Sequence, residues 1–341
     1  MRQVMIEGPR IVTVVEESDP VLADASSAIV EVSKTAICGS DLHFYEGDIP
    51  VGDGIAVGHE FIGTIVEIGR DVTHLRVGDR VLTSSVAGCG RCDGCDTLDP
   101  VTCVDGPLIF GSGMLGGGQA THVAVPAADF QMLPIPEWLG DEAALLLTDN
   151  LSTGWAGARR AEVRPGETVV VIGLGPVGLC AVRSAFALGA GTVLAFDPVP
   201  ERRELAADSG AVPIEGDVVH AVLDATAGRG AHRVIDAVAL DGTLDQAFAS
   251  VRAGGTISVI GVHDLTPYPM PMLMSLFRSI TLRTTTAPVH QTWGELLPLL
   301  EDSTLRTDGI FTHTFALDDA AEAYRAAASR DQGCMKVMLK P

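Results

Sequence analysis

Residues 169–178 read VVVIGLGPVG: the β-branched run Val169–Ile172 leads directly into a glycine-rich turn, and an apolar helix is expected to follow. Asp197 closes the next strand-like run, 19 positions after the last glycine of the turn. A strand, such a turn, a helix and a later acidic residue are together typical of a dinucleotide site. The pattern predicts cofactor contacts at Gly173, Gly175, Pro176, Val177 and Gly178.

Glycine and proline suit this turn for physical reasons. A pyrophosphate must approach backbone N–H groups at the start of the helix, and a Cβ at Gly173 or Gly175 would stand in its way. Pro176 is tolerated because the first helical turn makes no use of the missing N–H. The alternative is a glycine-rich turn that packs a helix on a strand and binds no ligand.

The acidic residue predicts which dinucleotide binds. Asp197 can accept hydrogen bonds from both ribose hydroxyls, and its charge would repel a 2′-phosphate, which favours NAD over NADP. Arg202 and Arg203 follow closely and could hold a 2′-phosphate. We interpret both as solvated residues of the next helix.

On either side of the turn the sequence changes character. From 168 onward, strand-like runs alternate with helical ones, which predicts βαβ units and a doubly wound parallel sheet over residues 151–287, a Rossmann domain. Residues 1–150 contain short β-branched runs cut by Gly, Pro and Asp, as expected for a mostly antiparallel β domain. Residues 288–341 do not extend the alternation and are expected to return to the first domain. The predicted class is α/β with two domains.

The overall charge limits the partners. The 341 residues include 44 acidic and 23 basic side chains, a net charge of −21, which makes nucleic acid and anionic membranes poor partners. The N-terminal sequence does not resemble a signal peptide, and no apolar run reaches the ~20 residues of a membrane span. We expect a soluble, cytoplasmic protein with a small-molecule ligand.

Four of the seven cysteines are close together in the sequence: Cys89, Cys92, Cys95 and Cys103. Four thiolates on a Gly- and Asp-rich loop suit a closed, tetrahedral zinc site, which is structural rather than catalytic. Two alternatives are an iron–sulfur cluster, for which the fourth cysteine is unusually placed, and four free thiols.

A second set of metal-ligand types is dispersed. Cys38 stands in CGSDLH (38–43), and His59 and Glu60 stand in GHEFIG (58–63). No second His follows four positions after His59, which excludes a zinc peptidase of the HExxH type. Taken singly, Cys38 fits a small core residue and His59 a hydrogen-bonded buried histidine.

Three features, in their order along the chain, resemble the zinc-dependent medium-chain alcohol dehydrogenases. The segment Gly58-His59-Glu60-x2-Gly63-x5-Gly69-x2-Val72 looks like that family's zinc signature, the four-cysteine loop like its structural zinc lobe, and the glycine turn like its cofactor turn. The resemblance spans essentially the whole chain. It implies a GroES-like β domain that carries both zinc ions, followed by a Rossmann domain.

The same resemblance implies roles for individual residues. Cys38, His59 and Asp149 would hold a catalytic zinc, with Glu60 behind the metal. The aspartate, where liver-type members carry cysteine, resembles bacterial secondary-alcohol dehydrogenases.

The resemblance implies further contacts beyond the metal. Ser40 and His43 would relay a proton, although His43 also fits an ordinary surface histidine. Thr153 would pack against nicotinamide. Lys336 would reach the pyrophosphate, or else be an exposed strand lysine.

The activity expected from this resemblance is hydride transfer between NAD and a small alcohol and its ketone or aldehyde, in a homo-oligomer, dimer or tetramer. A polyol, threonine or formaldehyde-adduct dehydrogenase of the same family is an alternative. An alternative of another class is a non-catalytic zinc- and dinucleotide-binding protein, which would have no use for the Ser40 and His43 relay.

Overall fold

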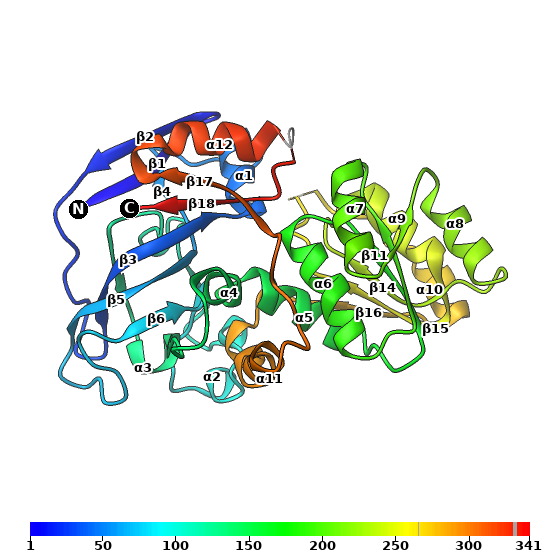
Figure 1. Cartoon of the computed structure of the whole chain (residues 1–341), viewed down its shortest axis with the longest axis horizontal. Coiled ribbons are helices and arrows are strands. Elements are labelled where there is room, and N and C mark those ends of the chain that lie inside the picture. The colour runs from blue at the N-terminus through cyan, green and yellow to red at the C-terminus, as the bar shows by residue number, and fades with distance from the viewer. Residues whose placement is uncertain (265, 330–332) are drawn as a thin grey trace. The chain divides into compact units, whose positions relative to one another are not determined.

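The computed structural model describes residues 1–264, 266–329 and 333–341. Two compact units account for the chain (Figure 1): unit 1 comprises Met1–Ser152, Ala287–Glu301 and Thr307–Pro341, and unit 2 comprises Thr153–Thr286 and Asp302–Arg306. In the part of the chain that is described, no helix combines the length and the apolar character needed to cross a membrane.

Unit 1 is built on a seven-stranded sheet in the order β10-β6-β5-β3-β18-β17, with β9 also paired to β3. Every pairing in it is antiparallel except β17 with β18. The strands are β3 (Ala28–Ile37), β5 (Glu60–Ile68), β6 (Arg80–Thr83), β9 (His122–Val125), β10 (Met132–Pro134), β17 (Phe311–Ala316) and β18 (Lys336–Lys340). This confirms the mostly antiparallel β architecture predicted for the first 150 residues.

Smaller elements complete unit 1. A three-stranded sheet contains β1 (Arg2–Gly8), β2 (Ile11–Glu16) and β4 (Ile55–Ala56), and a two-stranded one contains β7 (Val86–Ala87) and β8 (Leu108–Ile109). Its helices are α1 (Gly39–Glu46), α2 (Asp93–Asp96), α3 (Ala128–Gln131), α4 (Asp141–Leu147), α11 (Val289–Glu301) and α12 (Ala320–Ser329), and α5 (Asn150–Arg160) leads on into unit 2.

Two clusters of buried side chains stabilise unit 1. In one, Phe61 and Phe110 pack edge to face, with ring centroids 5.3 Å apart. In the other, Tyr45 of α1 and Tyr324 of α12 lie 5.5 Å apart between centroids and pack with apolar residues of β1 and β18. The second cluster places helix α12 next to α1, which leads directly away from β3 (Figure 1).

Unit 2 contains a six-stranded, all-parallel sheet in the order β13-β12-β11-β14-β15-β16. Val169–Ile172 are fully buried, as expected for a strand covered on both faces. The strands are β11 (Thr168–Ile172), β12 (Thr192–Phe196), β13 (Val212–Ile214), β14 (Ala231–Asp236), β15 (Val251–Val259) and β16 (Thr281–Thr284); the helices are α6 (Pro176–Ala187), α7 (Pro200–Asp208), α8 (Val218–Ala225), α9 (Asp241–Ser250) and α10 (Met272–Arg278). The predicted parallel sheet is confirmed.

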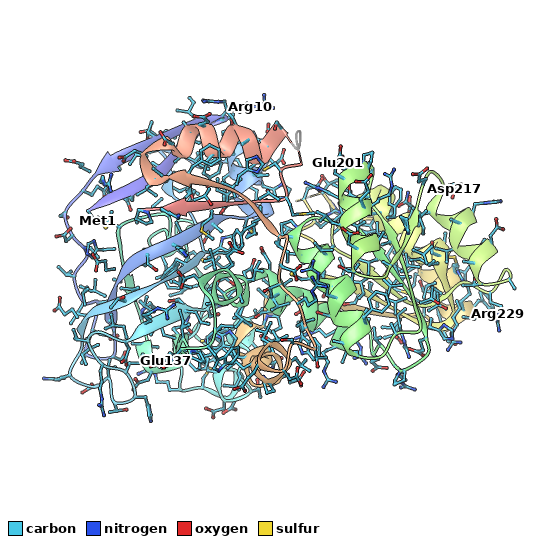
Figure 2. The ribbon with its side chains drawn as sticks, viewed as in Figure 1. Met1, Arg10, Glu137, Glu201, Asp217 and Arg229 are labelled. Carbon is cyan, nitrogen blue, oxygen red and sulfur yellow. The ribbon has the colours of Figure 1, made fainter. Side chains whose placement is uncertain are left out.

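Local signals explain where the helices of unit 2 begin. Asp217, labelled in Figure 2, is the N-cap of α8, and its Oδ1 accepts the N–H of His220 at 3.0 Å. Pro176 and Pro200 stand in the first turns of α6 and α7. The sequence pattern missed β13, because a three-residue edge strand that contains Pro213 carries almost no periodicity.

Candidate functional site

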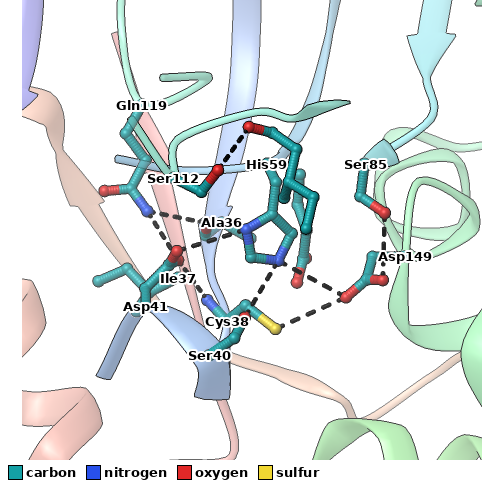
Figure 3. A network of polar contacts seen from close by, with 12 residues as sticks. Ala36, Ile37, Cys38, Ser40, Asp41, His59, Ser85, Ser112, Gln119 and Asp149 are labelled. Atoms are coloured by element: carbon teal, nitrogen blue, oxygen red, sulfur yellow. Dashed lines mark hydrogen bonds and ion pairs between the residues drawn. The ribbon is translucent and has the colours of Figure 1, made fainter. Parts of the chain in front are cut away.

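Four buried residues of unit 1 converge: Cys38, His59, Glu60 and Asp149. One ligand atom of each lies within 4.8 Å of the others. Cys38 is the N-cap of α1 directly after β3. Glu60 is the first residue of β5 and His59 directly precedes it, and Asp149 lies between α4 and α5. Figure 3 shows the side chains of Cys38, His59 and Asp149 pointing toward one another. The dispersed residues of the sequence pattern are therefore neighbours in space.

The spacing of the donor atoms suits a metal ion. Asp149 Oδ2 lies 3.6 Å from Cys38 Sγ and 3.7 Å from His59 Nε2. Tetrahedral zinc, with ligand bonds of about 2.0–2.3 Å, places its donors about 3.5 Å apart. A thiolate, an imidazole and a carboxylate are also the ligand types that zinc prefers. The residues present therefore fit zinc.

Burial and charge shift the pKa values of two of these groups. Burial, together with the charge of Glu60, raises the pKa of the Cys38 thiol. For His59, burial disfavours the charged ring, but Asp41 and Cys38 outweigh it and raise the pKa of the imidazole well above its usual value. The cluster thus concentrates negative charge in a buried place, which a bound cation would offset.

Asp41 orients the histidine and was not singled out from the sequence. Its carboxylate is fully buried, with Oδ1 3.4 Å from His59 Nδ1 and Oδ2 accepting the Cys38 N–H at 2.9 Å. Because Nδ1 faces Asp41, Nε2 is the atom that His59 presents to the cluster (Figure 3). The only local signal is its place three residues after Cys38.

The carboxylate of Glu60 is contacted by the side chains of Asn150 and Lys336. Asn150 Nδ2 donates to Glu60 Oε1 at 3.0 Å, and also to Asp149 Oδ2 at 3.1 Å. Lys336 Nζ lies 2.8 Å from Glu60 Oε2 and donates to the carbonyl of Ile37 at 3.2 Å. Asn150 was missed by the sequence analysis, since an amide next to a ligand has no distinctive pattern.

The interpretation of Lys336 as an exposed strand lysine is wrong. Its side chain is 0% exposed, because β18 lies between β3 and β17 in the sheet rather than at an edge. Burial lowers the pKa of Lys336, but the charge of Glu60 outweighs it, so that the pKa is raised. Within the described residues, its ammonium group contacts the carboxylate of Glu60 and the carbonyl of Ile37, which lie next to the metal ligands in the sequence.

The two residues expected to relay a proton differ in their surroundings. Ser40 Oγ lies 3.5 Å from His59 Nε2, at the edge of the cluster. His43, one turn later on α1, is partly exposed, and its Nδ1 lies 2.9 Å from Asp48 Oδ2. Residues three apart on a helix share a face, so Ser40 and His43 lie on the same side of α1.

The four cysteines form a second compact cluster in unit 1, and their sulfur atoms lie within 4.8 Å of one another. Cys89 Sγ and Cys95 Sγ are 4.0 Å apart, and Cys92 Sγ and Cys103 Sγ are 3.9 Å apart. Zinc–sulfur bonds of about 2.3 Å place tetrahedral thiolates about 3.8 Å apart, so this set fits a closed zinc site.

The four thiols have different surroundings, which shift the pKa values of Cys92 and Cys95 in opposite directions. Hydrogen bonds from backbone N–H groups lower the pKa of Cys92 to about 6, whereas burial raises that of Cys95 to about 12. The loop closes tightly, because a Cβ at Gly94 would meet the carbonyl oxygen of Thr102 at 2.2 Å. In the described part of the chain, Cys89, Cys92, Cys95 and Cys103 form no disulfide.

In unit 2, the glycine turn joins β11 to α6 as predicted. Gly173 has φ +85°, and a Cβ at Gly178 would meet the Gly173 carbonyl oxygen at 1.8 Å. Beside Gly175 the space is open except for Arg202 Nη1 at 3.8 Å. Thr153 is buried in α5.

Asp197, directly after β12, contacts this turn. Its Oδ2 accepts the N–H of Leu174 at 2.8 Å and its Oδ1 that of Val199 at 2.9 Å. Each carboxylate oxygen retains further acceptor capacity toward a ribose hydroxyl.

The expectation that Arg202 and Arg203 are solvated is wrong. Their side chains are only 17% and 14% exposed. Arg203 Nη1 donates to the carbonyl oxygen of Asp197 at 2.8 Å, and Arg202 Nη1 lies 3.7 Å from Asp197 Oδ2. Both guanidinium groups fold back onto the segment that follows β12 instead of extending into water.

Comparisons with known proteins cover both units. Residues 24–137 match the alcohol dehydrogenase GroES-like domain, and residues 176–302 match the zinc-binding dehydrogenase family. A relative from Mycobacterium tuberculosis, named "Probable zinc-binding alcohol dehydrogenase", is 55% identical over 341 residues, which is 100% of this chain and 89% of the relative. An alcohol dehydrogenase of Cupriavidus necator is 34% identical, with 93% of this chain and 92% of the relative covered.

Solved structures agree with this assignment. The alcohol dehydrogenase TADH from Thermus sp. ATN1 has a TM-score of 0.94 at 36% identity, covering 100% of this chain and 99% of that chain. A zinc-dependent alcohol dehydrogenase from Streptococcus pneumonia has a TM-score of 0.91 at 32% identity, covering 100% and 98%. The resemblance found in the sequence is thereby confirmed, and the non-catalytic alternative is not supported. The chain belongs to the zinc-dependent medium-chain alcohol dehydrogenase family and is a zinc-dependent oxidoreductase.

Proposed function

We propose that Cys38, His59 and Asp149 hold the catalytic zinc of this enzyme, which transfers hydride between NAD and a small alcohol and its ketone or aldehyde. The observation that carries the proposal is the convergence of a thiol, an imidazole nitrogen and a carboxylate at separations suited to one ion. Zinc, when bound, supplies a Lewis acid that lowers the pKa of a nearby hydroxyl, as it lowers that of water from about 16 toward about 7.

The surrounding residues prepare this site. Asp41 keeps the Nε2 atom of His59 facing the cluster, and Lys336 with Asn150 holds the Glu60 carboxylate beside it. We assign Ser40 to relay the proton that leaves the alcohol hydroxyl: its oxygen accepts this proton as its own hydroxyl proton moves on toward His43. His43, on the same face of α1 and partly exposed, would pass the proton to water.

NAD is the proposed dinucleotide, bound at Gly173, Gly175, Pro176, Val177, Gly178 and Asp197, with Thr153 as the further expected contact. Lys336, which the resemblance places at the pyrophosphate, is instead buried against Glu60. The open space beside Gly175 supports this assignment, as does the carboxylate of Asp197, which would repel a 2′-phosphate. A relative from E. coli, 26% identical, is described as complexed with NADH, and one from Sinorhizobium meliloti, also 26% identical, as bound to NADP. Saturation curves with NAD and NADP separate these possibilities.

Small secondary or primary alcohols are the proposed substrates. A polyol substrate is the second candidate, because a sorbitol dehydrogenase of Bacillus subtilis is 30% identical over 92% of this chain. The decisive experiment measures NADH formation over short alcohols, diols and sugar alcohols, together with zinc per chain. Two zinc ions and alcohol-dependent NADH support the proposal; activity that survives removal of all zinc contradicts it.

We further propose a homodimer formed through unit 2. Strand β16 is at the edge of the parallel sheet, and neighbouring α10 exposes Met272, Leu273, Leu276 and Phe277, the last by 84%. Unpaired edges and apolar patches of this kind are usually covered by another chain. Sedimentation of the wild type beside Phe277→Lys tests this: a wild-type monomer contradicts it. We place the enzyme in the cytoplasm, where the cysteine thiols stay reduced and able to bind zinc.

A further inference from the structure

A chain of buried hydrogen bonds leads from the proposed catalytic zinc site to helix α12. The Tyr324 hydroxyl donates to Gln119 Oε1 at 2.9 Å. Gln119 Nε2 donates to Asp41 Oδ2 at 3.1 Å, and Asp41 Oδ1 faces His59 Nδ1 at 3.4 Å. Tyr324, Gln119 and Asp41 are fully buried, so water does not compete for these bonds. Figure 3 shows the part of the chain from Gln119 to His59.

Tyr324 on one side, and Ala36 and Asp41 on the other, orient the amide of Gln119. Burial, and then the charge of Asp41, raises the pKa of Tyr324 well above its usual value, so the hydroxyl keeps its proton, which it donates to Gln119 Oε1. A donor at this place requires the amide oxygen of Gln119 to face it. The NH2 group is then directed at Ala36, whose carbonyl oxygen it meets at 3.2 Å, and at Asp41.

The backbone of Gln119 is equally well defined. Its N–H donates to the carbonyl of Val57 at 3.0 Å, and Gly118 N–H donates to that of Gly58 at 2.7 Å. A Cβ at Gly58 would lie 2.4 Å from Gln119 Cγ, so glycine is needed for this close approach. Gln119 is thus fastened to the residues that immediately precede His59.

The hydrogen bonds to Asp41 leave one oxygen for the histidine. Oδ2 accepts from Cys38 N–H and from Gln119 Nε2. Oδ1 makes no other hydrogen bond within the described residues and faces His59 Nδ1. The two carboxylate oxygens are equivalent, but a rotation of the group out of its present plane would lengthen both bonds at Oδ2, so the two donors fix the plane that directs the other oxygen at His59.

We propose that Gln119 and Tyr324 are positioning residues of the catalytic metal site, which act through Asp41 to keep His59 Nε2 directed at the zinc. This inference rests on the proposed function. It makes the zinc affinity depend on a hydroxyl group from α12, 205 residues away from Gln119 in sequence. Partners behind a metal ligand typically change metal affinity by about 10- to 100-fold.

The test compares Tyr324→Phe with Tyr45→Phe. Both variants remove one hydroxyl from the same pair of packed rings, but only Tyr324 belongs to the chain of hydrogen bonds. Gln119→Met, which keeps the length of the side chain and loses its N–H groups, is the second variant. Zinc retained at the site of Cys38, His59 and Asp149 is measured against increasing chelator, and the absorption spectrum of the cobalt-substituted protein reports the ligand geometry.

We expect Tyr324→Phe and Gln119→Met to bind this zinc about 10-fold or more weakly and to alter the cobalt spectrum, and Tyr45→Phe to leave both unchanged. In an Asp41→Asn background, Tyr324→Phe should add nothing. Equal zinc binding by Tyr324→Phe and Tyr45→Phe would overturn this inference alone. A wild type that holds zinc only at the four cysteines would overturn the proposed function and this inference together.

Discussion

The two metal-ligand clusters of unit 1 are built in opposite ways. Cys89, Cys92, Cys95 and Cys103 lie within one loop of 15 residues, whereas Cys38 and Asp149 are 111 positions apart. The local cluster provides four thiols of one kind, a closed set. The dispersed cluster combines three ligand types, with Glu60, Lys336 and Asn150 behind them.

Because of this difference, we expect one cluster to contribute mainly to the stability of the protein and the other mainly to the reaction. A local set of ligands assembles only when its own loop folds, so metal binding there contributes directly to folding. A dispersed set is positioned by β3, β5 and α4, which are stabilised by their own packing. Removing a ligand should therefore destabilise the loop in the first case and stop the reaction in the second.

The largest effect is expected at the dispersed cluster. Asp149→Ala should lower alcohol-dependent NADH formation by about 1,000-fold, since several kcal/mol of transition-state stabilisation depend on the metal. Its free energy of unfolding should change much less. Steady-state kinetics and urea unfolding check the two parts, with the exposed Asp53→Ala as control. Full activity in Asp149→Ala would show that the ligand assignment is wrong.

For the four-cysteine cluster we expect the opposite result, a large loss of stability. Cys95→Ser should remove one zinc per chain and lower the free energy of unfolding by about 4 kcal/mol or more. Metal analysis and denaturant unfolding measure this. Cys180→Ala, which changes a buried cysteine outside both clusters, should keep both zinc ions. If Cys95→Ser unfolds like the wild type, the loop does not need its metal and the contrast drawn above fails.

A pH-dependent effect is expected where α11 packs near the cysteine loop. His290 is stacked on Phe130, with centroids 4.3 Å apart, and burial lowers the pKa of its imidazole to about 3. An unfolded histidine has a pKa of about 6.5 and binds a proton that the folded state refuses. Stability is therefore complete above pH 6.5 and falls as the pH is lowered toward 3.

At pH 5 this loss amounts to about 2 kcal/mol relative to pH 7. His290→Phe should lack it, whereas the exposed His74→Asn should behave as the wild type. Urea unfolding of the zinc-loaded proteins at both pH values measures the difference. Identical losses in His290→Phe and the wild type would contradict the assignment.

The smallest effect on stability is expected in unit 2, at a residue that belongs to neither metal-ligand cluster and so serves as a control for both. Asp217→Ala removes the N-cap of α8 in unit 2 and should cost about 1 kcal/mol, through the lost bond to the N–H of His220. Thermal unfolding measures it, and Asp217→Asn should recover most of the loss. Zinc content and kcat should not change, since the residue belongs to neither cluster; a loss of zinc here would show that the two units are coupled.

Whatever depends on neighbours in the sequence was predictable. The alternation of strands and helices, the glycine turn at 173–178 and the four-cysteine loop are patterns within a few to fifteen residues, and the chemistry of each follows from residue type and spacing. Cys38, His59 and Asp149 are different. No spacing rule connects them, and only the resemblance to a family indicated that they belong together.

The sequence by itself thus determined the fold class, the cysteine ligand set and the dinucleotide turn. Only the tertiary structure decided that Asp41 supports His59, that Lys336 is buried against Glu60 276 positions away, and that Tyr324 reaches Gln119. The physical reason is that a buried polar group must find a partner wherever the packed strands and helices provide one. That partner depends on which strands are neighbours in the sheet, and not on distance along the chain.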